Sequence, residues 1–345
     1  MERREARFRA RKDGIERPEG IGEEAVQRVL RVPPELAGMR LDRFLQGQLR
    51  ATSRTRSQAI IDVCAFRPDG RPLKKNHRVQ ADERVILWRD PLDAEGAPET
   101  LTIVYQDEDI LAVQKPPNVA VHPTARHHRA TVSRILEDQL PDDRLTLIHR
   151  LDRETSGVLL LARTRAADRA VKIQFEERKN VDKRYLAIVW GHPPWDRQRC
   201  DLPLGPATDT IYRVKMGVVE GGLPSATSFE VLGRRWRGDR AYALVGCELH
   251  TGRQHQIRVH LRALGFPIVG DKLYGPDEAI FARGADDQLT EEDLARLELP
   301  RHALHALSLT IDHPRDGRRL TIEAPLAPDL ATFWKGLEER PSTDR

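Results

Sequence analysis

The stretch HRLDRETSG, residues 149–157, decides the architecture of the larger part of this chain. Residues 145–148 before it are mostly leucine and isoleucine, and residues 158–161 after it read Val-Leu-Leu-Leu, so a buried strand is expected on each side. Charged side chains between buried strands are costly to bury unless they are paired, so this loop is a candidate functional site. Asp152 has one arginine two positions before it and another directly after it, which favours its ionised form. Taken alone, the segment suits an ordinary polar turn ending in Thr-Ser-Gly equally well.

Outward from this loop, short apolar runs alternate with polar turns and one helical pattern. Residues 166–178 have the spacing of a helix, and Gly191 ends the strand that follows it. The basic stretch GRRWRGDR, residues 233–240, separates the last two strands. This pattern predicts an α+β domain over residues 101–335 with a largely antiparallel mixed sheet flanked by helices and loops. Its strands are expected at residues 103–105, 110–113, 158–161, 185–190, 226–232 and 241–249.

Residues 37–90 have the pattern of a small independent domain. Apolar residues at positions 41, 44, 45 and 49 follow helical spacing, and a second helix is expected to begin near Ser53. Short strands are expected around the turn Pro68-Asp69-Gly70. The remaining segments are expected to be a basic flexible arm at residues 1–36, a polar linker at 91–100 and a polar tail at 336–345.

Positive charge gathers in this N-terminal domain. Residues 40–90 contain twelve Lys or Arg against six acids, a local net charge of +6, whereas the whole chain of 345 residues carries only +4. Clustered positive charge is the electrostatic footprint of a nucleic-acid-binding protein. Arg54 and Arg56 stand at a predicted helix start, where they add to the positive end of the helix dipole, so they are candidate RNA contacts. A solvated face without a partner is the alternative for this cluster.

Composition excludes several classes of protein. No apolar run approaches the ~18 residues of a membrane span, and the charged start MERREARFRARKDG lacks the apolar core of a secretory signal. Cys64, Cys200 and Cys247 are isolated, so they predict neither a disulfide framework nor a paired-cysteine metal site. A reducing cytoplasm is therefore the expected location.

A second segment, HTGRQHQIRVH at residues 250–260, gathers arginines and histidines. Apolar residues spaced i, i+4 and i+7 from Ile257 predict a helix that Gly265 ends, with Arg258 on another face. The three histidines are five residues apart, which places them on different faces of such a helix, unlike the i, i+4 pair of a zinc helix. We therefore expect no metal site there.

Taken together, HRLDRETSG and HTGRQHQIRVH resemble the RluA-type family of RNA pseudouridine synthases. The resemblance covers about residues 101–335, and Asn118 stands where the family usually has glycine. Asparagine is among the few residues that tolerate the left-handed conformation, so this departure is a mild one. Four further stretches agree with the family in order: KPPNVAVHP at 115–123, KRYLA at 183–187, GDKLYG at 270–275 and RHALHA at 301–306.

A separate resemblance covers the N-terminal domain. RLDRFL at residues 40–45 and SRTRSQAII at 53–61 are similar to the S-four-like RNA-binding domain, which implies a small α/β RNA-binding fold. The following stretch CAFRPDGRPL, residues 64–73, departs from the Val-x-Val-Asn-Gly run that is usual in that family. The departure concerns the loop contacts rather than the fold.

The RluA-type resemblance implies the roles of individual residues. Asp152 would be the catalytic aspartate, Tyr185 would stack on the target base, and Arg258 would pair with the carboxylate. The reaction breaks the N1–C1′ bond of uridine and joins C5 to C1′, so it is redox-neutral and needs no cofactor or metal. The carboxylate either attacks C1′ or removes a proton from C2′, and the sequence leaves both routes open. The implied substrate-binding residues are Arg150, Thr155 and His255.

Structured RNA with exposed loops is the expected partner, because the reacting base must leave its stack at a cost of a few kcal/mol. The basic N-terminal domain favours ribosomal RNA, with transfer RNA as the alternative, and a monomer is expected. Two other classes of function stay open. One is a hydrolase that cleaves an N-glycosidic bond with Asp152 and Glu154, although two carboxylates so close in one loop fit poorly on either side of a bond. The other is a non-catalytic RNA-binding or ribosome-assembly protein in which Asp152 only holds Arg258.

Overall fold

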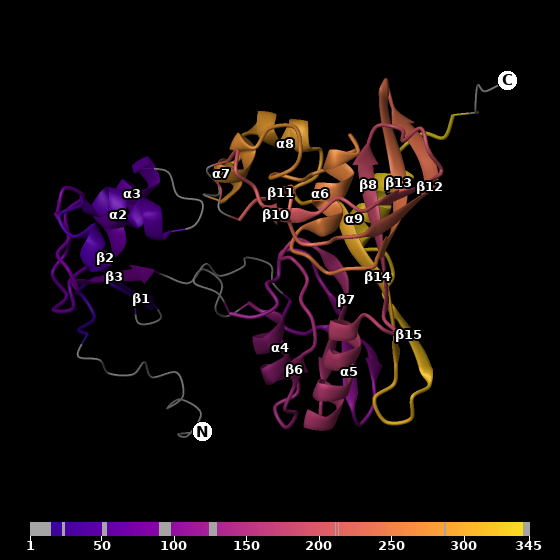
Figure 1. Cartoon of the computed structure of the whole chain (residues 1–345), viewed down its shortest axis with the longest axis horizontal. Coiled ribbons are helices and arrows are strands. Elements are labelled where there is room, and N and C mark those ends of the chain that lie inside the picture. Colours follow the sequence, from indigo (N-terminus) through magenta and orange to yellow (C-terminus); the bar gives the residue numbers. More distant parts are fainter. Residues whose placement is uncertain are drawn as a thin grey trace. The chain divides into compact units, whose positions relative to one another are not determined.

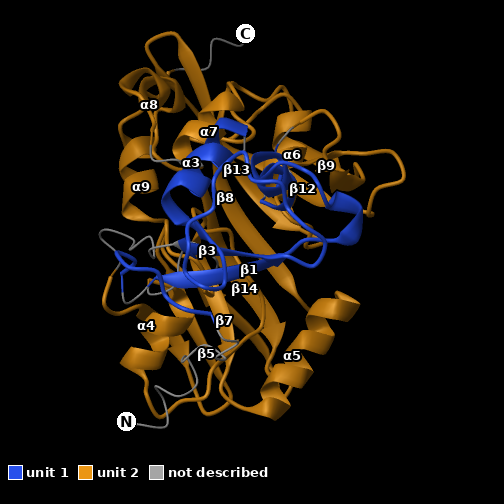
Figure 2. Cartoon of the chain, turned by 90° about the vertical axis from the view of Figure 1, so that its left-hand side faces the viewer, with its two compact units in different colours: residues 1–93, 124–128, 211–214 blue, residues 94–123, 129–210, 215–345 orange. Residues whose placement is uncertain are grey.

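The chain forms two compact units, which Figure 2 shows in different colours. The N-terminal unit comprises residues 1–93 together with 124–128 and 211–214, and the C-terminal unit comprises 94–123, 129–210 and 215–345. Each unit has a hydrophobic core of its own. The computed structural model describes residues 15–22, 25–49, 54–89, 98–123, 130–210, 212, 214–285 and 288–340.

The N-terminal unit combines a small antiparallel sheet, in the order β1-β3-β2, with two helices that pack together (Figure 1). Leu41, Phe44 and Leu45 lie on one face of the first helix and are buried in the core of the unit, as their spacing predicts. The two predicted helices of this domain are therefore confirmed. The elements are β1 (Val26–Arg31), a 3-10 turn (Pro34–Leu36), α2 (Leu41–Gln48), α3 (Arg54–Cys64), β2 (Ala65–Phe66) and β3 (Arg84–Arg89).

The expected boundary of this domain at residue 37 is wrong. Strand β1 lies in the segment predicted to be a flexible arm and pairs with β3 along its whole length. Leu30 and Val32 are buried in the core of the unit. Arginine and glutamine fill half of β1, so its composition resembles an arm although the strand is part of the sheet. Residues 1–14 of the predicted arm lie outside the described residues.

The C-terminal unit is built on one mixed sheet, which contains ten strands in the part of the chain that the structure describes. Its strands follow the order β4-β5-β7-β14-β8-β13-β12-β9, with β15 beside β14 and β6 beside β7. Only the pair β7–β14 is parallel among these strands, so the predicted, largely antiparallel α+β fold is confirmed. The strands are β4 (Thr102–Gln106), β5 (Ile110–Lys115), β6 (Thr146–Leu147), β7 (Ser156–Ala162), β8 (Asp182–Trp190), β9 (Arg197–Cys200), β12 (Thr227–Arg237), β13 (Arg240–Leu249), β14 (Leu304–Asp312) and β15 (Arg319–Glu323).

Helices cover both faces of this sheet, and a small two-stranded sheet of β10 (Leu204–Pro206) and β11 (Met216–Val218) lies apart from it in the pairing pattern. Among the described helices, none combines the length and the apolar character that a membrane crossing needs. The helices are α4 (Val132–Gln139), α5 (Arg165–Glu177), α6 (Gln256–Ala263), α7 (Ala279–Ala285), α8 (Glu291–Leu297) and α9 (Pro328–Lys335).

Strand β7, which contains the end of HRLDRETSG, lies at the centre of the core. Every residue of β7 is buried. Leu159 and Leu161 pack into a cluster with residues of α4, whereas Val158 and Leu160 pack into another cluster with residues of α5. A strand covered on both faces needs apolar residues at every position, which explains the continuous apolar run in the sequence.

The strands on either side of the basic stretch 233–240 are longer than expected. Strands β12 and β13 continue through the basic stretch 233–240, where Arg234 pairs with Asp196 at 2.9 Å and Arg240 with Glu298 at 3.1 Å. These ion pairs balance part of the positive charge of the hairpin.

The polar linker expected at residues 91–100 falls mostly on residues outside the described ranges.

The polar tail begins later than residue 336. Leu337 is buried in the core, and the backbone of Glu338 exchanges hydrogen bonds of 2.7 and 2.9 Å with that of Trp236. A single apolar residue in a polar segment has no periodicity, so this contact leaves no pattern in the sequence.

Gly157, the last residue of the HRLDRETSG stretch, has no room for an added side chain. Its φ is +116°, and a Cβ there would lie 2.1 Å from the carbonyl oxygen of Ala306 in the neighbouring parallel strand. We predict that Gly157→Ala lowers the free energy of unfolding of this unit by about 3 kcal/mol or more, because it adds a backbone clash to a strained φ. Calorimetric or denaturant unfolding measures the change.

Gly221→Ala is the matched control for this variant. Gly221 also has a positive φ of +74°, but no atom lies within 4 Å of a Cβ placed there. Its substitution should cost about 1 kcal/mol from backbone strain alone. Equal losses in the two variants would show that the close approach to Ala306 does not limit this position.

Candidate active site

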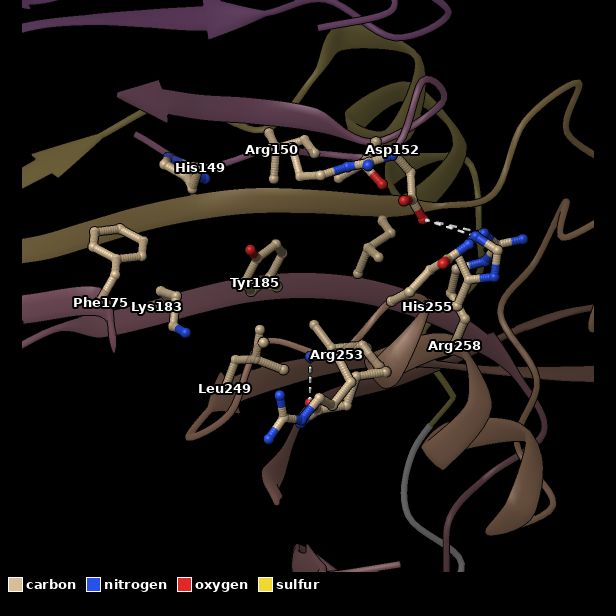
Figure 3. A pocket seen from close by; sticks show the side chains of 17 residues that line it. His149, Arg150, Asp152, Phe175, Lys183, Tyr185, Leu249, Arg253, His255 and Arg258 are labelled. Atoms are coloured by element: carbon tan, nitrogen blue, oxygen red, sulfur yellow. Dashed lines mark hydrogen bonds and ion pairs between the residues drawn. The ribbon is translucent and has the colours of Figure 1, made fainter. Parts of the chain in front are cut away.

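A pocket of about 320 Å³ opens beside the HRLDRETSG loop (Figure 3). Most of its walls come from three segments, namely the loop before β7, strand β8 and the stretch from the end of β13 into α6, and α5 and β14 add one residue each. The pocket therefore brings together the two sequence segments that were expected to carry the chemistry. Its lining residues are His149, Arg150, Leu151, Asp152, Thr155, Phe175, Lys183, Tyr185, Leu249, Gly252, Arg253, Gln254, His255, Gln256, Ile257, Arg258 and Leu304.

Arg258 of α6 connects two carboxylates at one end of this pocket. Its Nη1 donates to Oδ2 of Asp152 at 3.1 Å, while Nε and Nη2 donate to the two oxygens of Asp271 at 2.7 and 2.8 Å. The side chain of Asp271 is 0% exposed and that of Arg258 is 8% exposed, whereas Asp152 keeps 27% of its side chain exposed. The guanidinium of Arg258 is thus held by the buried Asp271, and its Nη1 donates to the carboxylate of Asp152, which faces the pocket.

Local hydrogen bonds orient both ends of this arrangement. Oδ1 of Asp271 accepts the backbone N–H groups of Leu273 and Tyr274 at 3.0 Å each, which closes a tight turn after Gly270. At the start of α6, Oε1 of Gln256 accepts the backbone N–H of Arg253 at 3.0 Å. The Gln256 amide also donates to the carbonyl oxygen of Ala226 at 2.9 Å, which joins the loop to the region before β12. Arg258 therefore projects from a well-supported first turn of the helix.

These contacts control the charge of the carboxylates. Burial alone opposes ionisation of Asp152, but His255, Arg258 and His302 favour the carboxylate more strongly, so the pKa of Asp152 lies below its usual value. Burial likewise opposes ionisation of Asp271, but Arg258 lowers its pKa to about 2. Both carboxylates are consequently ionised at neutral pH, and Arg258 remains a cation.

His255 lies directly beside the exposed carboxylate. Its Nε2 is 3.8 Å from Oδ2 of Asp152, and its Nδ1 shares a hydrogen bond of 2.9 Å with the hydroxyl of Tyr274. Burial and the nearby Arg258 lower the pKa of His255 to about 4, so the ring is neutral at pH 7. The guanidinium of Arg258 lies 4.9 Å from the centre of the Tyr274 ring, which packs the whole group tightly.

Tyr185 lies in the middle of the pocket on β8, between Asp152 and Leu249 in Figure 3. Burial, and then the charge of Asp152, raise the pKa of its phenol, so the hydroxyl stays protonated. Its ring presents the aromatic surface that a stacked base needs.

A buried arginine, which sequence reasoning did not single out, supports the loop from behind. Arg301 is 1% exposed and pairs with Asp329 through two hydrogen bonds of 2.7 and 2.9 Å. Its other donors reach the carbonyl oxygen of Glu154 at 3.1 Å and the hydroxyl of Ser156 at 3.2 Å. The RHALHA stretch was noted only as part of a resemblance, and its role is to hold the HRLDRETSG loop.

Lys115 supports the same loop from another side. Its buried ammonium donates to the carbonyl oxygens of Pro116, Val119 and Arg153 at 2.7, 2.8 and 2.9 Å. Burial lowers its pKa to about 7. The KPPNVAVHP stretch therefore places a donor under the backbone next to Asp152.

The remaining predicted residues fall into two groups. Arg150 is exposed at the pocket, and Thr155 also lines it, but the Thr155 hydroxyl hydrogen-bonds to Nε2 of His302 at 2.8 Å. Arg54 and Arg56 belong to the N-terminal unit, and none of the lining residues of the pocket comes from that unit. Arg54 pairs with the buried Asp42 at 3.2 Å, so it supports the packing of α3 on α2.

One group of described residues has the spacing of metal ligands, and it lies away from the pocket. Asp107, Asp109 and His313 bring their ligand atoms within 4.8 Å of one another. However, Asp107 accepts a hydrogen bond from Tyr105 at 2.7 Å and contacts His313 at 2.8 Å, and Asp109 pairs with Arg315. These groups already satisfy one another, so the cluster is an ion-pair network that ties β4 and β5 to the end of β14.

Several known proteins are similar to this chain in sequence and in fold. The sequence model of the family described as RNA pseudouridylate synthase matches residues 109–263. The ribosomal large subunit pseudouridine synthase D of Nitrosomonas europaea is 35% identical over 322 residues, covering 90% of this chain and 88% of that protein. The protein of the same name from Pseudomonas aeruginosa is 34% identical over 315 residues, covering 88% and 94% of the two chains.

A solved structure of human RNA pseudouridylate synthase domain containing 1 aligns with a TM-score of 0.54 and 31% identity, covering 67% of this chain and 86% of that one. This alignment, the similarity of the full-length relatives and the family match agree with the two sequence segments that meet in the pocket. The chain therefore belongs to the RNA pseudouridine synthases of the RluA type, enzymes that isomerise uridine in RNA.

Proposed function

We propose that this pocket converts specific uridines of structured RNA to pseudouridine with Asp152 as the reacting group and without a cofactor, and that large-subunit ribosomal RNA is the substrate. The observation that carries the proposal is the carboxylate of Asp152. It is partly exposed in the pocket and is held ionised by Arg258, whose charge is in turn balanced by the buried Asp271. A carboxylate that stays ionised when RNA excludes water is the group that the chemistry at C1′ and C2′ requires.

The chemistry uses this carboxylate in one of two ways. In the first, Asp152 attacks C1′, the N1–C1′ bond breaks, and uracil leaves with the bond pair before C5 bonds to C1′ and displaces the carboxylate. In the second, Asp152 removes a C2′ proton as the same bond breaks and uracil leaves with the bond pair, which gives a glycal, and Asp152 returns the proton to C2′ as C5 bonds to C1′. In both routes C5 finally loses its proton to the carboxylate of Asp152, which is free again at this stage, and N1 takes up a proton, which restores the aromatic base. No electrons are gained or lost overall, so the proposed reaction needs no redox partner.

The other lining residues take supporting roles in this proposal. The ring of Tyr185 stacks on the target base, and Arg150, exposed at the pocket, occupies the space that the flipped nucleotide leaves. Neutral His255 contacts the ribose beside Asp152. Thr155 acts through His302 to position the loop.

The geometry argues against cleavage by two carboxylates. Glu154, the second acid of the loop, pairs with Lys272 at 2.8 Å and with His302 at 3.3 Å. Burial opposes the ionisation of Glu154, but these partners hold its pKa well below its usual value. Glu154 is therefore ionised at neutral pH and cannot act as the general acid that protonates a leaving base. Release of free uracil would reveal the hydrolase alternative.

Ribosomal RNA is favoured as the substrate by two observations. Two relatives that align over 90% and 88% of this chain are named ribosomal large subunit pseudouridine synthase D. The N-terminal unit, whose sequence resembles the S-four-like RNA-binding domain, contains the +6 cluster of residues 40–90. Mapping of pseudouridines in total RNA from cells with and without the gene tests this assignment, and a missing modification in transfer RNA alone would contradict it.

Asp152→Asn should abolish pseudouridine formation while RNA affinity and the melting temperature change little. The amide is nearly isosteric, but it is neither a nucleophile nor a base, and loss of such a group costs about 10²–10⁴ in rate. Tritium release from RNA that contains [5-³H]uridine measures the rate. More than a few per cent of the wild-type rate would remove Asp152 from the catalytic role.

Arg258→Met should move the acid limb of the pH–rate profile upward. In the wild-type protein the low pKa of Asp152 keeps the carboxylate ionised, so the single-turnover rate should be flat from about pH 5 to 7. Without the guanidinium, burial raises that pKa, and the rate should fall at a pH at least about one unit higher. Arg258→Lys should restore part of the profile.

Two companion variants make the test of Arg258 specific. Arg262→Met removes the same charge from the exposed side of α6 and should leave the profile unchanged. Arg258→Met combined with Asp271→Asn removes the buried carboxylate that the single variant leaves unpaired, and so protects the fold. An unshifted acid limb in both Arg258→Met proteins would show that Arg258 does not control Asp152.

Removal of residues 1–93 should weaken RNA binding more than it slows chemistry. This unit holds the basic cluster, whereas every proposed catalytic residue lies in the other unit. Each lost phosphate contact lowers the slope of log affinity against log salt by roughly 0.7–0.9, and uniform binding energy does not enter kcat. Titrations at three salt concentrations and single-turnover rates make the comparison. An unchanged slope would identify the cluster as a solvated surface.

A further inference from the structure

Lys183 is a pocket residue without a role in the mechanism above. It lies on β8 two positions before Tyr185, so both side chains project from the same face of the strand about 7 Å apart. Figure 3 shows it at the opposite end of the pocket from Asp152 and Arg258, with Tyr185 between them. Its Nζ lies 5.8 Å from the centre of the Phe175 ring and 3.7 Å from where a Cβ on Gly252 would be.

The half-buried ammonium of Lys183 differs from the other cations around this pocket in its partners. Lys272 pairs with Glu154, Arg258 with two aspartates, and Lys115 with three carbonyl oxygens. Among the described residues, by contrast, no carboxylate forms an ion pair with Lys183. Burial, and then the charge of Arg178, lower its pKa to about 8. A cation that is removed from water without a counter-charge has a strong tendency to bind an anion.

Two further positive groups lie near Lys183 or in the pocket wall. Arg178 caps the end of α5 in the left-handed conformation and acts on the charge of Lys183. Arg253 lines the pocket, and its Nε is occupied only by a long contact of 3.3 Å to the carbonyl oxygen of Pro224. In RNA the anion that such a group meets is the phosphodiester, because uracil is neutral before the glycosidic bond breaks.

We propose that Lys183 binds the backbone phosphate next to the flipped uridine and thereby places the ribose of that uridine against Asp152. The inference rests on the proposed function and names a phosphate subsite of the same pocket. Because Lys183 lies two positions from Tyr185 on β8, its ammonium would lie next to the edge of a base stacked on the Tyr185 ring. From there it can contact the RNA phosphate backbone that carries this base. Lys183 is thus a substrate-positioning residue rather than a catalytic one.

The test uses Lys183→Met and a short RNA with one uridine flanked by adenosines. Lys183→Met should weaken binding of this RNA about tenfold or more, since it removes one charge-assisted hydrogen bond. It should also lower the salt slope by about 0.7. Lys183→Arg should restore most of both losses. Lys172→Met is the matched control, because Lys172 lies on α5 outside the pocket and pairs with Asp168 at 2.6 Å, so binding should stay near the wild-type level.

A neutral methylphosphonate at either linkage beside the uridine completes a double-mutant cycle. With the wild-type protein, one of the two neutral linkages should weaken binding about tenfold, and with Lys183→Met the same linkage should cause little further loss. An equal loss in both proteins at each linkage would overturn the proposal. On the mapped target RNA at saturation, the single-turnover rate of Lys183→Met should fall about tenfold or more, because the ribose is then held less well against Asp152, and Lys183→Arg should restore most of that rate.

A large fall in that rate with unchanged affinity would overturn the phosphate contact and assign Lys183 to the departing base instead. The proposed function fails in a different way, through the absence of pseudouridine in every protein including the wild type. In that case the binding cycle still decides whether Lys183 contacts a phosphate.

Discussion

The site depends on one shared guanidinium. Arg258 neutralises Asp271, which is fully buried, and an N–H of its Nη1 holds Asp152, which is not fully buried. Either carboxylate alone in a covered pocket would tend to take up a proton, because a charge removed from water must be paired to persist. Asp271 supplies the second negative charge that holds Arg258 in a single orientation, so that the exposed carboxylate meets a fixed cation rather than a mobile one. The shared contact also joins α6 to the loop before β7, two elements that are far apart in the sequence.

The supports of this arrangement explain why the chemistry-bearing segments are scattered. Lys115 and Arg301 hold the backbone of the HRLDRETSG loop through the carbonyl oxygens of the adjacent residues Arg153 and Glu154. Donors directed at carbonyl oxygens fix the course of a loop whatever its side chains are, so the side chains of Arg150 and Asp152 can face the pocket. Gly157 lets the loop enter the parallel pairing with β14 at a distance that no side chain permits. The reacting group is thus placed by a rigid frame, which preorganised electrostatic catalysis needs.

Sequence patterns predicted much of the fold but little of the geometry of the site. The apolar run of β7, the hairpins and the helix after Gly252 followed from periodicity and turn residues. The ion pair between Asp152 and Arg258 joins residues 106 positions apart, and no spacing rule connects them, so only the family resemblance placed them together. The sequence motifs that contain Asp271 and Arg301 predict no role for either residue, because the burial of a charge depends on partners from distant segments. Strand β1 and Leu337 escaped prediction since their apolar residues are few and acquire meaning only when the rest of the core packs against them.

The most direct measurement of the central claim is the titration of Asp152 itself. In the full chain labelled with ¹³C at aspartate carboxyl carbons, Asp152→Asn identifies the signal that belongs to this residue. The account predicts that this signal keeps the chemical shift of a carboxylate from pH 7 down to about pH 4, the ordinary value for aspartate, because His255 and Arg258 outweigh burial and hold the pKa of Asp152 below that value. A midpoint above about pH 4 would mean that burial outweighs these neighbours, and the account of this site would then be wrong.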